Sequence, residues 1–350
     1  ETNGSETTME GASVAFNIDL VAAAGGATLN LEHRASLPSA LAILQSENNF
    51  SRVTLWGRIL GDKQDYIIAQ GYSPSLDDKR ERSVVAGGNP LLAEFFHNLR
   101  QIPKKTFRLS PDGVTFVPVP PVDDEIIRKN KEFTKDLTSK GQVFAPFSGD
   151  PATKLPYQFV IPPPPKEPKE PKPPAAEGEE EAEPEAEAEA EPAEEEEEAQ
   201  ATIEEREISE EERLAFAIDA IDHDTNVVPR GAFILGSSAR ILQNTAFAGL
   251  EQHEARKLTN YFHLRPPEKL QGLPMQDRAA LAKSLDFLDP LSLDTPKGCW
   301  ASGFDGTNNS ATLRSLIWPG YTFYHVVGTS NYGSFYSGTC ERNLDIAFML

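Results

Sequence analysis

Three carboxylates lie close together in the stretch "DAIDHDTN", residues 219 to 226, and could in principle bind a divalent cation. Asp219, Asp222 and Asp224 offer the oxygen ligands that calcium and magnesium prefer. No glutamate follows at the position that closes an EF-hand loop, and the three residues cross the expected end of a helix. The pattern therefore favours a helix end that runs into a polar turn, and we predict no metal site.

Thiol chemistry is the second option, because Cys299 precedes Trp300 in "PKGCWASG". A thiol nucleophile needs a neighbouring base, and the sequence singles out none of its six histidines, which also lack zinc-ligand spacing. The sequence contains no Gly-x-Ser-x-Gly elbow, phosphate-binding loop or dinucleotide-binding glycine pattern. We therefore expect no catalytic residue, no bound cofactor and no enzymatic activity.

Aromatic residues are concentrated near the C-terminus, in segments with the alternation of β-strands. Two interpretations remain open. The first, which the alternation favours, is ordinary packing within a sheet. The second is a flat aromatic surface edged by arginines, of the kind enriched at protein–protein contacts. On the second interpretation the candidate interface residues are Trp56, Arg58, Arg230, Arg314, Trp318, Tyr321, Tyr324, Tyr332 and Tyr336.

The stretch "SRVTLWGRIL", residues 51 to 60, must position the first two of these candidates, and it is typical of a strand. Strict alternation places Val53, Leu55 and Ile59 on one face and Thr54, Trp56 and Arg58 on the other. The turn-like residues 61–64 and the apolar run 65–72 predict the return strand of a hairpin. Gly57 would let another backbone, from this chain or from a partner, approach closely.

Helices are predicted where apolar residues recur at helical spacing, namely over 34–49, 89–102, 123–138, 209–222 and 251–264. In the first helix Ser36 is the expected cap and Pro38 falls in the first turn. In the fourth, Ser209 and Glu212 fit a capping box.

Strands account for most of the remaining apolar segments. Residues 106–121 predict a hairpin around Pro111-Asp112-Gly113, and residues 226–235 predict two short strands separated by a proline break. The tail predicts a hairpin with strands at 311–327 and 332–338. The expected fold class is therefore α+β, built from antiparallel β-hairpins or sheet and amphipathic helices.

Residues 162 to 200 differ sharply in composition from the rest of the chain. They contain sixteen glutamates and three lysines, so they carry −13 of the total formal charge of −21. The proline-rich first part favours an extended spacer, and the second part lacks large apolar residues that could offset the entropy of ordering. We predict a disordered Pro/Glu/Ala-rich acidic linker over 162–204. A solvated spacer is the favoured role, and an acidic binding tail is the alternative.

This linker separates two parts of the chain in the expected domain organisation. Residues 1–27 are predicted to be disordered or loosely ordered, and residues 28–161 and 205–350 are predicted to build the two halves of one body. The sequence leaves open whether the halves share one core.

Composition also limits the compartment and the partners. Two cysteines are too few for a disulfide scaffold, which indicates a reduced intracellular compartment. No apolar run approaches the length of a membrane span. Clustered basic residues are lacking, so we expect neither nucleic acid nor a membrane surface as a partner.

Several motifs, in this order, are similar to those of the radial spoke head protein 9 family. They are "RASLPSALAILQSENNFSRVTLWGRILGDKQDYIIAQG" (34–71), "VVPRGAFIL" (227–235), "GLEQHEARKLTNYFHLRPPEKL" (249–270), "SLDFLDPLSLDTPKGCW" (284–300), "LRSLIWPGYTFYH" (313–325) and "NYGSFYSGTCERNLDIAFML" (331–350). The resemblance covers about two thirds of the chain. Residues 74–102 and the acidic linker resemble insertions, and Phe116 stands where the family pattern has tryptophan.

The resemblance implies a non-catalytic structural subunit in the radial spoke head of the axoneme, within the cytoskeleton of motile cilia and flagella. It implies packing against radial spoke head proteins of the 4 and 6 type and other head subunits. It also implies transient contact with central-pair projections, through which mechanical signals reach the dynein arms. The alternative function, drawn from the residues alone, is a soluble adaptor that recruits partners through its acidic Pro-rich linker.

Overall fold

The structure is a computed structural model. It describes residues 26, 29–50, 52–72, 104–161, 202–235, 241–269, 272, 274–280 and 284–349. The predicted helix over 89–102, the acidic residues 162–200 and most of the N-terminal segment 1–27 lie outside these residues.

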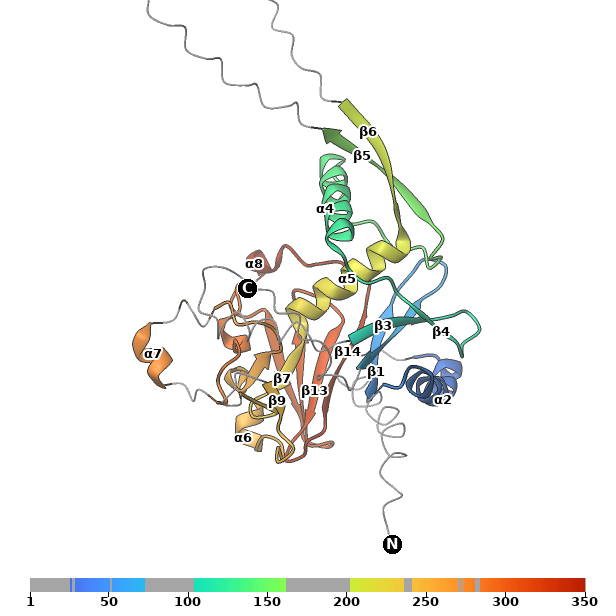
Figure 1. The fold of residues 1–350 in the computed structure, drawn as a ribbon. Helices are drawn as coiled ribbons and strands as arrows, with labels where there is room; N and C mark the ends of the chain where they lie inside the picture. The colour runs from blue at the N-terminus through green and yellow to red at the C-terminus, as the bar shows by residue number, and fades with distance from the viewer. Residues whose placement is uncertain are drawn as a thin grey trace, which may run out of the picture.

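An eight-stranded sheet forms the centre of the described fold, with the strand order β11-β12-β13-β14-β1-β2-β3-β4 (Figure 1). The strands are β1 (Arg52–Ile59), β2 (Tyr66–Tyr72), β3 (Lys104–Leu109), β4 (Phe116–Pro118), β11 (Trp300–Asp305), β12 (Ser310–Ser315), β13 (Tyr321–Val326) and β14 (Tyr332–Gly338). Neighbouring strands are antiparallel except β1 and β14, which pair in parallel. This one pairing joins the N-terminal and C-terminal parts of the chain into a single sheet.

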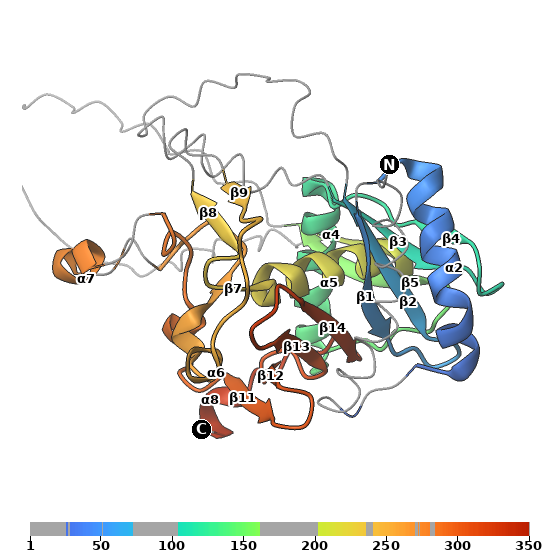
Figure 2. The ribbon, with the colours of Figure 1, turned by 90° about the horizontal axis from the view of Figure 1, so that it is seen from below.

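Two helices, α2 (Leu31–Asn48) and α5 (Glu210–Thr225), cover opposite faces of this sheet (Figures 1 and 2). The adjacent β2 residues Ile67 and Ile68 show the two faces, because they belong to different hydrophobic clusters. The Ile67 cluster includes the α2 residues Leu37, Leu41 and Leu44. The Ile68 cluster includes the α5 residues Leu214, Ile218 and Ile221, together with residues from β11 to β14. Both parts of the chain therefore contribute to the larger core.

The predicted strict alternation of β1 is wrong, because the strand carries a β-bulge. Leu55 is opposite Ala69 and Gly57 is opposite Ile68, so Trp56 is an extra residue without a partner in β2. The bulge reverses the side-chain parity beyond it. Leu55 packs in the cluster of α2, whereas Ile59, predicted on the same face, packs with Trp56 in the cluster of α5.

A β-hairpin outside the eight-stranded sheet lies beside α4 (Asp124–Ser139), at the end of the molecule away from α2 (Figure 1). It pairs β5 (Lys154–Ile161) with β6 (Thr202–Ser209), and Ile161 is opposite Thr202. The acidic segment is therefore the connection within a hairpin. The first residues of β6, from Thr202 to Glu204, were predicted to belong to the linker, and the structure places them in a strand.

Short elements complete the C-terminal half: β7 (Val227–Pro229), β8 (Phe233–Leu235), β9 (Ile241–Gln243), α6 (Gln252–Ala255), the 3₁₀ turns Leu258–Asn260 and Leu291–Leu293, β10 (Tyr261–His263), α7 (Met275–Ala280) and α8 (Ile346–Met349). The predicted helix over 251–264 is wrong. It stops after one turn because Tyr261–His263 pairs with β7, where Tyr261, Phe262 and His263 are all buried. Tertiary pairing here overrides the helical spacing of the sequence.

Of the other local predictions, some are confirmed and some are corrected. The capping box of Ser209 and Glu212 and the hairpin formed by β3 and β4 are confirmed. Helix α2 begins at Leu31, so Ser36 is not its cap and Pro38 lies inside it. The strand predicted over 311–327 is two strands, β12 and β13, separated by the turn that contains Trp318.

Candidate functional site

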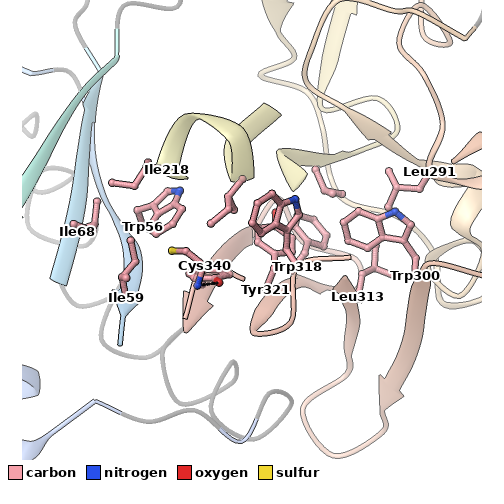
Figure 3. Close-up of a cluster of buried hydrophobic side chains, with 14 of the residues drawn as sticks. Trp56, Ile59, Ile68, Ile218, Leu291, Trp300, Leu313, Trp318, Tyr321 and Cys340 are labelled. Carbon is pink, nitrogen blue, oxygen red and sulfur yellow. Dashed lines mark hydrogen bonds between the residues drawn. The ribbon is translucent and has the colours of Figure 1, made fainter. Parts of the chain in front are cut away.

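All three tryptophans of the chain donate a hydrogen bond to an aspartate. Trp56 Nε1 donates to Asp222 Oδ1 at 2.6 Å, and Trp318 Nε1 donates to Asp224 Oδ2 at 3.0 Å. Both acceptors lie on the last turns of α5, so this helix is tied to β1 and to the turn before β13. Figure 3 shows the three indoles in a row across the larger core. A hydrogen bond to a charged acceptor contributes about 1.5–3 kcal/mol.

Asp222 is shared by three donors, which explains how the end of α5 is held over β1, β2 and β3. Besides the Trp56 indole, it accepts a hydrogen bond from Gln70 Nε2 at 2.7 Å and forms an ion pair with Lys104. Asp224 accepts from Trp318 and lies near Arg342, at 3.5 Å. Burial disfavours its ionised form, but the hydrogen bonds from His223 and Trp318 outweigh burial and lower the pKa of Asp224.

The sequence predicted that a helix ends within residues 219–226, and α5 does end there, at Thr225. Two of the three carboxylates accept hydrogen bonds from indole N–H groups, Asp222 from Trp56 on β1 and Asp224 from Trp318 in the turn before β13. Across the residues that the structure describes, no group of three His, Cys, Asp or Glu side chains has the arrangement of a metal site.

A third carboxylate, Asp294, is buried and joins the loop before β11 to β10. It accepts from Trp300 Nε1 at 2.7 Å, lies 2.7 Å from His263 Nε2, and forms an ion pair with Lys269 at 2.9 Å. Burial disfavours its ionised form, but the His263 contact and the Lys269 and Trp300 bonds lower the pKa of Asp294. Three side chains of the same subunit engage this carboxylate, so it has the character of a structural anchor, although Nδ1 of the buried His263 has no hydrogen-bond partner among the described residues.

Neither cysteine has the environment of a nucleophile. Burial raises the pKa of Cys299 to about 11 and that of Cys340 to about 12. A reactive cysteine needs a lowered pKa and solvent access, and these two thiols have neither.

The structure places five of the six aromatic interface candidates inside the subunit. Their exposed fractions lie between 1% and 8%. These residues are Trp56, Trp318, Tyr321, Tyr324 and Tyr336. Their burial contradicts the outward aromatic surface and agrees with the interpretation that the sequence favoured, packing within the sheet. They belong to the two clusters that α2 and α5 form with the sheet. Tyr332 is partly buried against the larger core.

The close approach predicted at Gly57 is made by strand β14 of the same chain. A Cβ atom built on Gly57 would lie 2.2 Å from the carbonyl oxygen of Tyr336. The ring of Tyr336 packs against Trp56, with ring centroids 5.3 Å apart. The residues around Trp56 therefore serve the parallel pairing of β1 with β14.

The three arginine candidates lie at separate places and differ in their partners. Arg58 donates to Ser337 Oγ at 3.2 Å, and Arg230 forms a two-point contact with Asp286 at 2.7 and 2.8 Å. Arg314 is exposed on β12 and has no carboxylate within ion-pair distance among the described residues. The structure brings Arg314 and Tyr321 together, because both line a groove of about 480 Å³.

Sequence reasoning missed the acceptor roles of Asp222, Asp224 and Asp294, and it missed the buried carboxylate of Glu210. Glu210 accepts hydrogen bonds from Tyr66, Ser148 and the Gly149 backbone. Asp294 lies six residues before Trp300, which was an available signal for that pair. The partners of Trp56 and Trp318 are far away in the sequence, and only the fold joins them.

These features define an α+β protein whose aromatic and acidic residues hold its own layers together and whose surface carries an apolar groove. No helix among the described residues has the length and apolar character needed to cross a membrane. No family model matches the chain.

Comparison with curated proteins identifies the family. The chain is 34% identical to "Radial spoke head protein 9 homolog" of Danio rerio over 344 residues, and 34% identical to that of Bos taurus over 342 residues. It is 33% identical to the Homo sapiens homolog over 342 residues. Each match covers 98% of this chain and 100% of the relative. The chain belongs to the radial spoke head protein 9 family, as the motif order predicted.

Proposed function

We propose that this protein is a non-catalytic structural subunit of the radial spoke head in the axoneme of motile cilia and flagella. Family membership over almost the whole chain carries the proposal. The described residues support a structural role, because the candidate chemical groups are used within the fold. The carboxylates accept hydrogen bonds from indole N–H groups, and the thiols are buried with raised pKa values.

Within the head, the subunit packs against radial spoke head proteins of the 4 and 6 type and meets central-pair projections transiently. Its contribution to signalling is mechanical, as a stiff body through which forces pass toward the dynein arms. The sheet supports this proposal, because β1 and β14 join both halves of the chain and a close-packed interior transmits strain.

Affinity purification tests the proposal. The full-length tagged protein is expressed in ciliated cells, and spoke material is extracted with salt from demembranated axonemes. We expect spoke-head proteins of the 4 and 6 type to co-purify in stoichiometric amounts. Recovery of the protein alone, or with unrelated partners bound through the acidic segment, would contradict a structural role in the head and favour an adaptor.

A further inference from the structure

The sheet face that α2 covers is left uncovered by described elements at its other end. On this face, Arg314 of β12 lies opposite Thr322 of β13, and Thr322 lies opposite Phe335 of β14. Phe335 packs in the cluster that includes α2. Two strands further along, Arg314 is exposed. Figure 2 shows α2 over the β1 to β4 end of the sheet, away from β11 and β12.

A groove of about 480 Å³ lies at this uncovered end. Its apolar lining includes Ala301 of β11, Ile346 of α8, and Leu316, Pro319 and Gly320 of the β12–β13 connection. The lining is largely apolar, and Arg314 is its single charged residue.

One exposed apolar residue lines the groove, and two more lie close in sequence to another lining residue. Leu316 lines it and is 36% exposed, while Leu344 and Phe348 flank Ile346 in sequence and are 62% and 89% exposed. Isolated exposed apolar residues are ordinary, but an apolar groove that an exposed leucine lines is a candidate interaction site. The groove therefore combines a largely apolar lining with one exposed cation, Arg314, and this composition suits a protein contact.

The charge at the groove specifies the chemistry of its occupant. The Arg314 guanidinium has no carboxylate within ion-pair distance among the described residues, and a guanidinium pairs best with a carboxylate through two parallel hydrogen bonds. The chain carries a net charge of −21, so an acidic partner gains no general attraction from it. An acidic residue that docks here must be recognised locally.

We propose that this groove binds a segment of another spoke-head protein that presents apolar side chains and one Asp or Glu to Arg314. The inference rests on the proposed function and adds the place and the chemistry of one subunit contact. The apolar side chains fill the groove beside Leu316 and Ile346, and the carboxylate of the partner pairs with the exposed guanidinium.

Substitution tests the chemistry of the contact. The probe is a purified radial spoke head protein of the 4 or 6 type, titrated against the full-length chain. Arg314→Glu is expected to weaken binding at least about 30-fold, because it places two like charges together. Leu316→Asp is expected to weaken binding similarly. The matched controls are Lys131→Glu on the exposed side of α4 and Val114→Asp in the exposed β3–β4 turn, and both should bind like wild type.

Photo-crosslinking from a benzophenone amino acid at position 316 identifies the occupant. A cross-link to an acidic segment of the probe protein, together with rescue of Arg314→Glu by charge reversal in that segment, would support the proposal. A cross-link to a second copy, or to another part of the same chain, would overturn it. Wild-type binding that persists in both Arg314→Glu and Leu316→Asp would overturn it and leave the proposed function intact. If the wild-type chain did not bind the probe protein at all, both this proposal and the proposed function would be refuted.

Discussion

Single residues show how polar groups stabilise the interior of this protein. Trp56 and Trp318 bury their rings in the larger core and direct their N–H groups to carboxylates on one helix end. A buried indole N–H without a hydrogen-bond partner would be unfavourable, as would an unpaired carboxylate that is partly buried. Each indole N–H and its carboxylate supply each other's hydrogen-bond partner. The two contacts therefore hold α5 in place and stabilise the fold.

His325 is a buried residue with a different consequence. It is fully buried in β13, and its ring lies 6.3 Å from that of Phe247. Burial lowers the pKa of His325 to about 4, although a backbone contact at Thr329 opposes the shift. The imidazole is therefore neutral in the folded protein at neutral pH.

This shift predicts an acid sensitivity. As pH falls from 6.5 toward 4, the unfolded chain binds a proton at His325 that the folded chain does not, so stability is lost over this range. Between pH 7 and pH 5 we expect a loss of about 2 kcal/mol from this group, measured as the free energy of unfolding in urea. In His325→Phe this part of the pH dependence should disappear, whereas His253→Gln, at an exposed position, should retain it. Equal pH dependence in both variants would refute the assignment.

At the scale of elements, the bulge in β1 decides how the two faces of the sheet are shared. The extra residue at Trp56 lets Leu55 face α2 and Ile59 face α5. Next to it, Gly57 permits the parallel pairing of β1 with β14, since the Tyr336 carbonyl occupies the space of a side chain.

Gly57→Ala should therefore separate these two strands. The added methyl group cannot fit 2.2 Å from a backbone oxygen, and we expect a loss of about 3 kcal/mol in the free energy of unfolding. The matched control is Gly306→Ala in the turn between β11 and β12, where nothing lies within 4 Å of an added Cβ atom. The control should unfold within about 0.5 kcal/mol of wild type. Similar stability of the two variants would mean that the β1–β14 contact is not rigid.

At the scale of the whole molecule, the acidic segment is an insertion into a hairpin rather than a connection between two bodies. Its flanking residues Ile161 and Thr202 are directly opposite each other in the β5–β6 pair. The halves of the chain are joined elsewhere, through β1 and β14 and through the core beneath α5.

Replacing residues 162–201 with an Asn-Gly turn should leave the body folded, because a two-residue loop suits strands in this register. A shorter loop loses less conformational entropy when its ends are brought together. The free energy of unfolding should therefore be unchanged or raised by up to about 2 kcal/mol. Binding to spoke-head proteins should persist in the affinity purification. A second variant keeps the segment at full length and changes its glutamates to glutamine. Loss of binding in the shortened variant but not in this one would show that assembly needs the length of the segment.

The sequence determined the local features that depend on neighbouring residues. The capping box at Ser209, the β1–β2 and β13–β14 hairpins and the helix over 124–139 were predictable because caps, turns and periodicity act over a few residues. The order of the motifs also determined the family, since it depends on residue identity alone.

Only the tertiary structure decided what the aromatic residues do. Burial of Trp56, Trp318 and Tyr336 depends on α5 and on strands far away in the sequence, and period-two spacing is the same for a covered and an open sheet face. Strand β10 within the predicted helix depends on pairing with β7, and the parity of β1 depends on a bulge. Contacts over such separations are decided by which surfaces the folded chain can bury together, and no local pattern contains that information.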